Sequence, residues 1–308
     1  MTIGIALHAV GGTNEIDATV DWAREAASAG VRSAWFGQTL GADALTLATV
    51  VGREVPQLHV GTAAIPVFAR HPLLTWSQAQ TAQAATRGRF HLGLALGTKR
   101  ITESAYGVPY ERPVARLREF LTVLREVRET GHTEFRGELV TAASALPTTV
   151  PGADAPIPLL VAAMGPQALR ASGELADGIL PFLAGPRALG EHIVPAVTAA
   201  AERAGRPAPR IAAFVPGIVT SDVARVRAAA VEQLAFYDPI PSYARIIELS
   251  GAERAADIAV IGDEEHLAAQ IQRYRDAGAT EVVVSNGQLS HAEDRTRTWK
   301  LLGELAAA

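Results

Sequence analysis

Short apolar segments alternate with longer amphipathic ones along almost the whole chain. Between the first two apolar segments, Ile16, Val20, Ala23 and Ala27 recur at the three- to four-residue spacing of one helix face. The apolar segments themselves are short and rich in β-branched residues, as strands are. We expect eight strands, at residues 3–8, 33–37, 58–67, 89–96, 157–164, 177–183, 210–220 and 281–287. Eight strands alternating with helices predict an α/β fold, the closed parallel (β/α)8 or TIM barrel.

Glycine ends several of the expected helices. Gly30, Gly131, Gly205 and Gly278 each follow a helical pattern. The residue after a helix often takes a left-handed conformation, which glycine adopts without a steric penalty. Three of these glycines lead into an expected strand, and Gly131 leads into an expected hairpin at 133–141.

The strands are evenly spaced except at two long insertions. Residues 97–156 hold a loop, a long helix at 110–131 and the hairpin, and residues 221–279 hold two or three helices. Long insertions in a barrel sit in its loops, often over the active face. We therefore expect both at the carboxyl-terminal face. No repeat or flexible linker marks a second domain, so residues 1–308 are expected to form one domain.

Composition narrows the possible partners. The chain is 48% hydrophobic and 19% charged, and its net charge of -4 gives no broad cationic surface for nucleic acid or anionic lipid. No apolar run approaches the roughly 20 residues of a membrane span, and no basic signal-peptide start is present, so we expect a cytoplasmic protein. The sequence contains no cysteine, which excludes disulfides, thiolate nucleophiles and cysteine-ligated zinc. We expect no metal site.

Familiar catalytic motifs are absent. The chain lacks G-x-S-x-G, H-E-x-x-H, and a G-x-G-x-x-G after a strand. Barrel enzymes place their sites at the carboxyl ends of the strands. Because no convincing acid/base pair occurs there, we expect a hydride-carrying cofactor to supply the chemistry. The strand ends offer His8, Gln38, residues 62–66, Gly97 with Thr98, Gly165 with Pro166, and Ser285, Asn286 and Gly287.

The segment 161–169 is the best candidate for anion binding. A strand runs directly into Gly165 and then Pro166, a residue favoured at the first position of a helix. Free amide groups at such a turn can hold a phosphate against the helix dipole. A plain tight turn without a ligand explains the same residues, so both interpretations stay open on this pattern alone.

Several blocks of the sequence resemble a known family. Residues 23–38, 59–97, 106–121, 158–178 and 260–285 resemble the bacterial luciferase-like superfamily, in particular its oxidoreductases that use the deazaflavin coenzyme F420. The resemblance implies a (β/α)8 barrel, usually a homodimer, with the coenzyme ring in the barrel mouth near the third strand. Family members carry a non-prolyl cis peptide at the end of that strand, which falls here between Ala63 and Ala64.

The resemblance also implies which residues contact the coenzyme. The phosphate falls at the turn around Gly165, while Arg70 and Lys99 are either contacts of the anionic tail or solvated surface charges. The catalytic candidates are His8 and Thr98. The expected cofactor-binding residues are Gly37, Gln38, Thr39, Thr62, Ala63, Ala64, Leu96, Gly97, Thr98, Ala163, Met164, Gly165 and Pro166.

Two departures from the family pattern shape the expected reaction. Deazaflavin dehydrogenases of the family have an acidic residue after the fourth strand and a histidine after the second, where this chain has Thr98 and Thr39. The usual proton-transfer pair is therefore missing. We expect hydride transfer between the deazaflavin C5 and a small organic substrate, as a reductase of an activated C=C or C=N bond, because such a reduction needs only a weaker proton donor. The alternatives are an FMN-dependent luciferase-like monooxygenase and a barrel that binds a flavin or deazaflavin without turnover.

Overall fold

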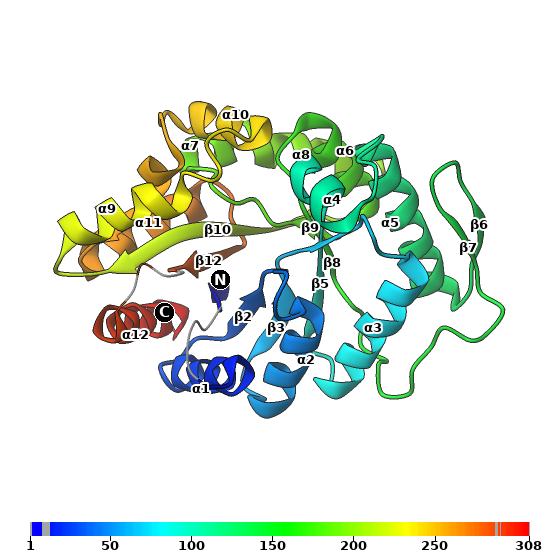
Figure 1. The fold of residues 1–308 in the computed structure, drawn as a ribbon, viewed down its shortest axis with the longest axis horizontal. Coiled ribbons are helices and arrows are strands. Elements are labelled where there is room, and N and C mark those ends of the chain that lie inside the picture. The colour runs from blue at the N-terminus through cyan, green and yellow to red at the C-terminus, as the bar shows by residue number, and fades with distance from the viewer. Residues whose placement is uncertain (1, 8–12, 287–288, 290, 308) are drawn as a thin grey trace.

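Eight parallel strands close into a barrel surrounded by helices (Figure 1). The computed structural model describes residues 2–7, 13–286, 289 and 291–307. The barrel runs in the order β1, β2, β3, β5, β8, β9, β10, β12, and β12 pairs with β1 to close it. The expected (β/α)8 class is confirmed. The barrel strands are β1 Thr2–Ala6, β2 Ser33–Phe36, β3 His59–Thr62, β5 Phe90–Ala95, β8 Leu159–Ala162, β9 Gly178–Ile179, β10 Arg210–Val219 and β12 Glu281–Ser285.

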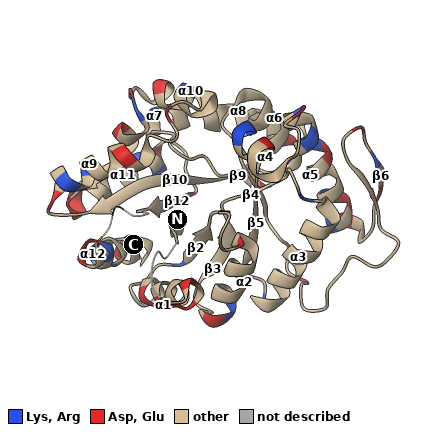
Figure 2. Ribbon diagram, viewed as in Figure 1, with Lys and Arg blue, Asp and Glu red and all other residues tan. Residues whose placement is uncertain are grey.

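Helices cover the outside of the barrel, and two groups of elements lie in the expected insertions. The four glycines expected to end helices all have positive φ, between 63° and 101°. Figure 2 shows both signs of charge interspersed on the outer helices. No helix in the described ranges is long and apolar enough to cross a membrane. The helices are α1 Glu15–Ser28, α2 Ala44–Glu54, α3 Pro72–Ala85, α4 Lys99–Tyr106, α5 Pro113–Thr130, α6 Pro166–Leu175, α7 Pro186–Ala188, α8 Val194–Arg203, α9 Val223–Leu234, α10 Pro241–Ser250, α11 Glu264–Asp276 and α12 Ala292–Ala307, with a π-helical turn at Leu189–Ile193 and a 3-10 turn at Ala255–Ile258.

Four expectations need correction, and one is confirmed. The strand expected at 58–67 is two pieces, β3 and β4 (Ile65–Pro66), and the strand expected at 177–183 is only the short β9. A further strand, β11 (Val260–Gly262), pairs with the end of β10 in the second insertion. The loop expected after the fourth strand contains helix α4. The hairpin is present, as β6 Glu134–Arg136 and β7 Thr141–Ala143.

The barrel interior follows from the two-residue alternation of the strands. In β8, Leu160 and Ala162 face the barrel centre, while Leu159 and Val161 pack toward the helices. Trp35 fills the middle of the barrel, where it packs with Leu160, Leu180, Ala212, Phe214 and Val283. Its ring fits because Gly61 has no side chain: a Cβ there would lie 2.5 Å from the indole. The interior is therefore a packed core below its mouth.

A polar cluster lies among the interior-facing residues at the amino ends of the strands. The carboxylate of Glu281 is fully buried, accepts hydrogen bonds from Ser33 and from Trp35 Nε1 at 3.0 Å, and is ion-paired with Arg210. Arg210 also lies 3.3 Å from Nδ1 of His91. Burial, together with Arg210 and His59, lowers the pKa of His91 to about 3. His91 is therefore neutral and can accept this hydrogen bond from Arg210.

We predict that Glu281→Ala destabilises the fold by about 3 kcal/mol, because it leaves Arg210 without its buried counter-charge. Glu54→Ala breaks an ion pair with Arg24 in which both side chains are about half exposed (52% and 51%), and should cost less than about 1 kcal/mol. Urea unfolding of both variants and the wild type measures the difference. Equal free energies of unfolding for the two variants would show that the Glu281–Arg210 pair stabilises the fold no more than the exposed Arg24–Glu54 pair does.

Candidate functional site

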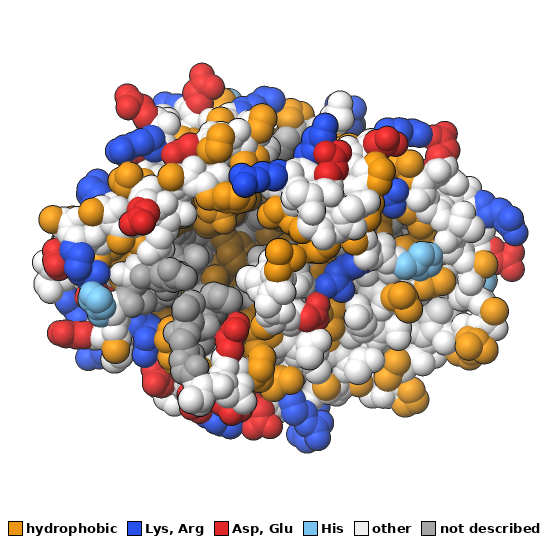
Figure 3. Space-filling view, in the orientation of Figure 1, with side chains coloured by type: hydrophobic (Ala, Val, Ile, Leu, Met, Phe, Trp, Pro, Cys, Tyr) orange, Lys and Arg blue, Asp and Glu red, His pale blue; other side chains and the backbone are white. Residues whose placement is uncertain are grey.

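The carboxyl-terminal face of the barrel is hollowed at its centre, with hydrophobic side chains at the bottom of the hollow (Figure 3). Small, partly exposed residues at the strand ends cover the interior core there: Ala6, Ala63, Ala64 and Ala162, together with the larger Phe182. Methyl groups are small, so a flat ring has room to lie directly against this surface. The coenzyme contacts expected from the sequence come from the ends of β2, β3, β5 and β8, which are consecutive in the barrel.

The third strand leaves the sheet at the expected place. The Ala63–Ala64 peptide is cis, as expected from the resemblance. Ala63 N donates to Phe36 O at 2.7 Å, and strand pairing with β5 resumes only at Ile65 and Leu94. The interruption places two alanines at the bottom of the mouth, where a regular ladder would have continued.

The side chain of Thr62 bridges the interruption. Its hydroxyl accepts from Gly93 N at 2.9 Å and lies 2.8 Å from Gly93 O. Thr62 is completely buried. The hydroxyl thus replaces the hydrogen bonds that the β3 backbone no longer makes to β5. In the structure, the Thr62 side chain joins β3 to β5. The coenzyme contact expected of Thr62 stays a prediction.

The loop after β2 is held by a polar network. Gln38 donates to Thr39 O at 2.7 Å, and its Oε1 accepts from Arg70 at 3.1 Å. Arg70 is also ion-paired with Asp43 at 2.8 Å, which accounts for the charge that the sequence left open. Gly37 lies beside the interrupted strand: a Cβ at this position would stand 3.5 Å from Ala63 O. Gly37 therefore borders the alanine floor, and the coenzyme contacts expected of Gln38 and Thr39 stay predictions.

The segment after β5 turns into helix α4. Gly97 has a φ of 71°, and its carbonyl accepts from the Tyr110 hydroxyl at 3.2 Å. Thr98 caps α4 by accepting from Ile101 N at 3.4 Å, so its hydroxyl hydrogen stays available for donation. Lys99 lies 4.0 Å from Glu103. The catalytic role expected for Thr98 stays a prediction, and His8 and Gly287 lie outside the described residues.

The turn after β8 borders a cavity of about 140 Å³. Met164, Gly165 and Pro166 line one side of it, and Ser242 and Arg245 of α10 line another. Helix α6 begins at Pro166 without a side-chain cap, so the amide groups of its first turn have no acceptor within the helix. A Cβ at Gly165 would meet nothing within 4 Å, which leaves the backbone open to a ligand. Arg245 is exposed and makes no ion pair within the described part of the chain.

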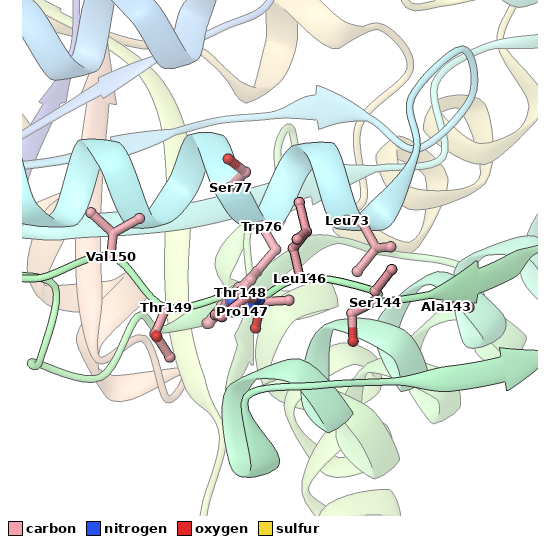
Figure 4. A pocket seen from close by; sticks show the side chains of 11 residues that line it. Leu73, Trp76, Ser77, Ala143, Ser144, Leu146, Pro147, Thr148, Thr149 and Val150 are labelled. Carbon is pink, nitrogen blue, oxygen red and sulfur yellow. The ribbon is translucent and has the colours of Figure 1, made fainter.

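A separate cavity of about 300 Å³ lies against helix α3 (Figure 4). It is bounded by the α3 residues Leu73, Trp76 and Ser77 and by residues 143–150. None of the strand-end residues contributes to it. The candidate site is therefore the hollow of Figure 3 together with the Gly165 turn.

Sequence reasoning missed the site residues that come from the second insertion. Arg245 approaches the Gly165 turn, and Tyr237 and Tyr243 contact Phe182 at the rim. These contacts join residues more than 50 positions apart, which no local pattern reports. The aromatic density of residues 236–243 was the one available signal.

This chain is similar to known proteins in both sequence and fold. The profile of the luciferase-like monooxygenase family matches residues 1–281. A Mycobacterium tuberculosis protein provisionally named a coenzyme F420-dependent oxidoreductase is 25% identical over 87% of this chain and 90% of its own length. An F420-dependent glucose-6-phosphate dehydrogenase of Rhodococcus jostii is 28% identical over 78% of this chain and 76% of its own. The solved structure of an F420-dependent secondary alcohol dehydrogenase with an F420–acetone adduct has a TM-score of 0.84 at 17% identity, covering 99% of this chain and 98% of that one.

The fold is that of a (β/α)8-barrel protein whose strand ends open into an apolar hollow. The chain belongs to the luciferase-like monooxygenase family. The resemblance stated from the sequence is thereby confirmed.

We predict that Thr62→Val lowers the free energy of unfolding by about 1 to 3 kcal/mol, because it leaves buried groups of Gly93 unpaired. Valine has nearly the same shape as threonine, so little packing is lost. The matched control is Thr81→Val on the exposed surface of α3, where the change should stay within about 0.5 kcal/mol. Chemical denaturation compares the two. If the Thr62→Val protein is as stable as the control, the Thr62 hydroxyl does not stabilise the contact between β3 and β5.

Proposed function

We propose that the protein is an F420-dependent oxidoreductase that reduces an activated C=C or C=N bond of a small organic substrate. Relatives that align with most of the chain carry F420-dependent names. The proposal rests on the combination of an apolar floor at Ala63, Ala64 and Ala162 with an open turn beside Arg245, which has no ion-pair partner among the described residues. The alanine floor suits a planar ring, and the Gly165 turn with Arg245 suits a phosphate.

The residues at the mouth fit the two ends of this coenzyme. The alanine methyl groups allow a ring to lie close to the backbone of the interrupted β3. At Gly165 a phosphate would receive the free amides of α6, the positive end of the helix dipole and the guanidinium of Arg245. The residues that follow β2 and β5 would contact the ring or its ribityl chain: Gly37, Gln38, Thr39, Leu96, Gly97 and Thr98.

Bound F420 in its reduced form supplies a hydride from C5. The apolar floor would cover one face of the ring, and the protein would hold the substrate against the other face and exclude water from it. Hydride addition to one carbon of the double bond needs a proton at the other atom. The Thr98 hydroxyl, His8 or water would deliver it, with solvent restoring the donor. The absence of an acidic residue at position 98 favours reduction over alcohol oxidation.

Two other functions make different predictions. The family name itself includes monooxygenases, which supports FMN with oxygen as the alternative cofactor chemistry. A protein that binds a flavin or deazaflavin without turnover would use the same mouth. We further propose that residues 1–308 act as one domain within a homodimer. The leucines Leu74 and Leu146, 67% and 78% exposed, support an apolar contact between copies.

Titration of the apoprotein with F420 and with FMN, followed by fluorescence, tests the cofactor. We expect F420 to bind and FMN to bind more weakly. Loss of the F420H2 absorbance on adding an enone or imine then separates an enzyme from a carrier. Binding of FMN without binding of F420 would overturn the proposal.

We also predict that Arg245→Gln weakens F420 binding by about tenfold, the effect of one lost charge-assisted hydrogen bond to phosphate. A phosphate-free deazaflavin, whose ribityl chain ends in a hydroxyl, should bind the variant and the wild type equally. Arg227→Gln on α9 is the control, because Arg227 is exposed and does not line the Gly165 cavity. Equal weakening of both ligands would show that Arg245 does not contact the phosphate.

A further inference from the structure

An aromatic cluster stands at one side of the barrel mouth. Phe182 follows β9 and packs on the same interior core as Ala64 and Ala162. Tyr237 meets the Phe182 ring edge-on at 5.2 Å, and Tyr243 does so at 6.2 Å. The two tyrosine rings lie 4.8 Å apart. The second insertion thus adds two tyrosines to a phenylalanine of the barrel rim.

The hydroxyl groups of this cluster have no assigned partner. Neither the Tyr237 nor the Tyr243 hydroxyl makes a hydrogen bond to any part of the chain that the structure describes. Burial raises the pKa of both phenols. Both are protonated at neutral pH, so each hydroxyl can donate one hydrogen bond.

The surroundings favour an uncharged ligand. The groups that meet here are alanine methyls and aromatic rings, which would desolvate a carboxylate or ammonium group without compensating it. Aromatic side chains instead bind flat rings by stacked or edge-to-face contact. A carbonyl oxygen on such a ring would satisfy a tyrosine hydroxyl.

We propose that Phe182, Tyr237 and Tyr243 form the substrate-selecting wall of the mouth and that the substrate is a neutral, flat ring bearing a conjugated carbonyl group. This inference rests on the proposed function, since the coenzyme would occupy the alanine floor and the substrate the space between floor and wall. The tyrosines of the second insertion then determine substrate specificity, while the alanine floor and the Gly165 turn with Arg245 hold the cofactor.

The test measures the dissociation constants of two probes for the protein loaded with oxidised F420, which cannot reduce them. The probes are 2-cyclohexen-1-one, a neutral ring, and crotonate, an open-chain anion. Wild type should bind the ring at least about tenfold more tightly. Tyr237→Ala should weaken ring binding by about two- to tenfold and leave crotonate unchanged. Tyr237→Phe keeps the ring contact and loses only the hydroxyl, so its effect should be smaller.

Two controls keep the outcomes separate. Val231→Ala, on the exposed side of α9, should match wild type for both probes. The F420 dissociation constant should be the same in every variant, because the wall does not hold the coenzyme. If F420 binds but the two probes bind equally, or if Tyr237→Ala affects both probes alike, the inference fails and the proposed function stands. If F420 does not bind, the proposed function fails, and the same titration of the apoprotein still decides whether the wall prefers the ring.

Discussion

The site depends on the two hydrogen bonds between the Thr62 hydroxyl and the backbone of Gly93. They hold β3 and β5 together where β3 stops pairing, so the next two residues can leave the sheet. Gly93 has to be a glycine for this approach, because a Cβ there would lie 1.9 Å from Thr62 O. The alanine floor of the mouth, and hence room for a planar ligand, follows from that one side-chain contact.

The amino end of the barrel contributes to stability, whereas the carboxyl end carries the candidate site. At the amino end, the buried Glu281 is ion-paired with Arg210, which also donates to the neutral His91. At the carboxyl end, Arg245 and the hydroxyls of Tyr237 and Tyr243 lack partners within the described chain. Unused polar groups are expected where a ligand completes them, which agrees with the general placement of sites in barrels.

The fold could be predicted because its signals are local. Each barrel strand and each closing glycine is a pattern within about fifteen residues. The errors have physical causes: β11 is only Val260–Gly262, too short for any period to appear, and α4 has only 8 residues, of which Thr102 alone is buried, so it spans about two turns. The position of the break in β3, at Ala63 and Ala64, came from the family resemblance. The site residues of the second insertion are placed by long-range packing, so local sequence patterns could not predict them.

The central claim is that a planar coenzyme lies on the alanine floor. Ala162→Phe, at the end of β8, would place a phenyl ring in that space while leaving the residues of the interrupted strand unchanged. The account predicts that this variant loses measurable F420 binding in a fluorescence titration while its midpoint of thermal unfolding stays close to that of the wild type. A folded Ala162→Phe protein that binds F420 with wild-type affinity would contradict it.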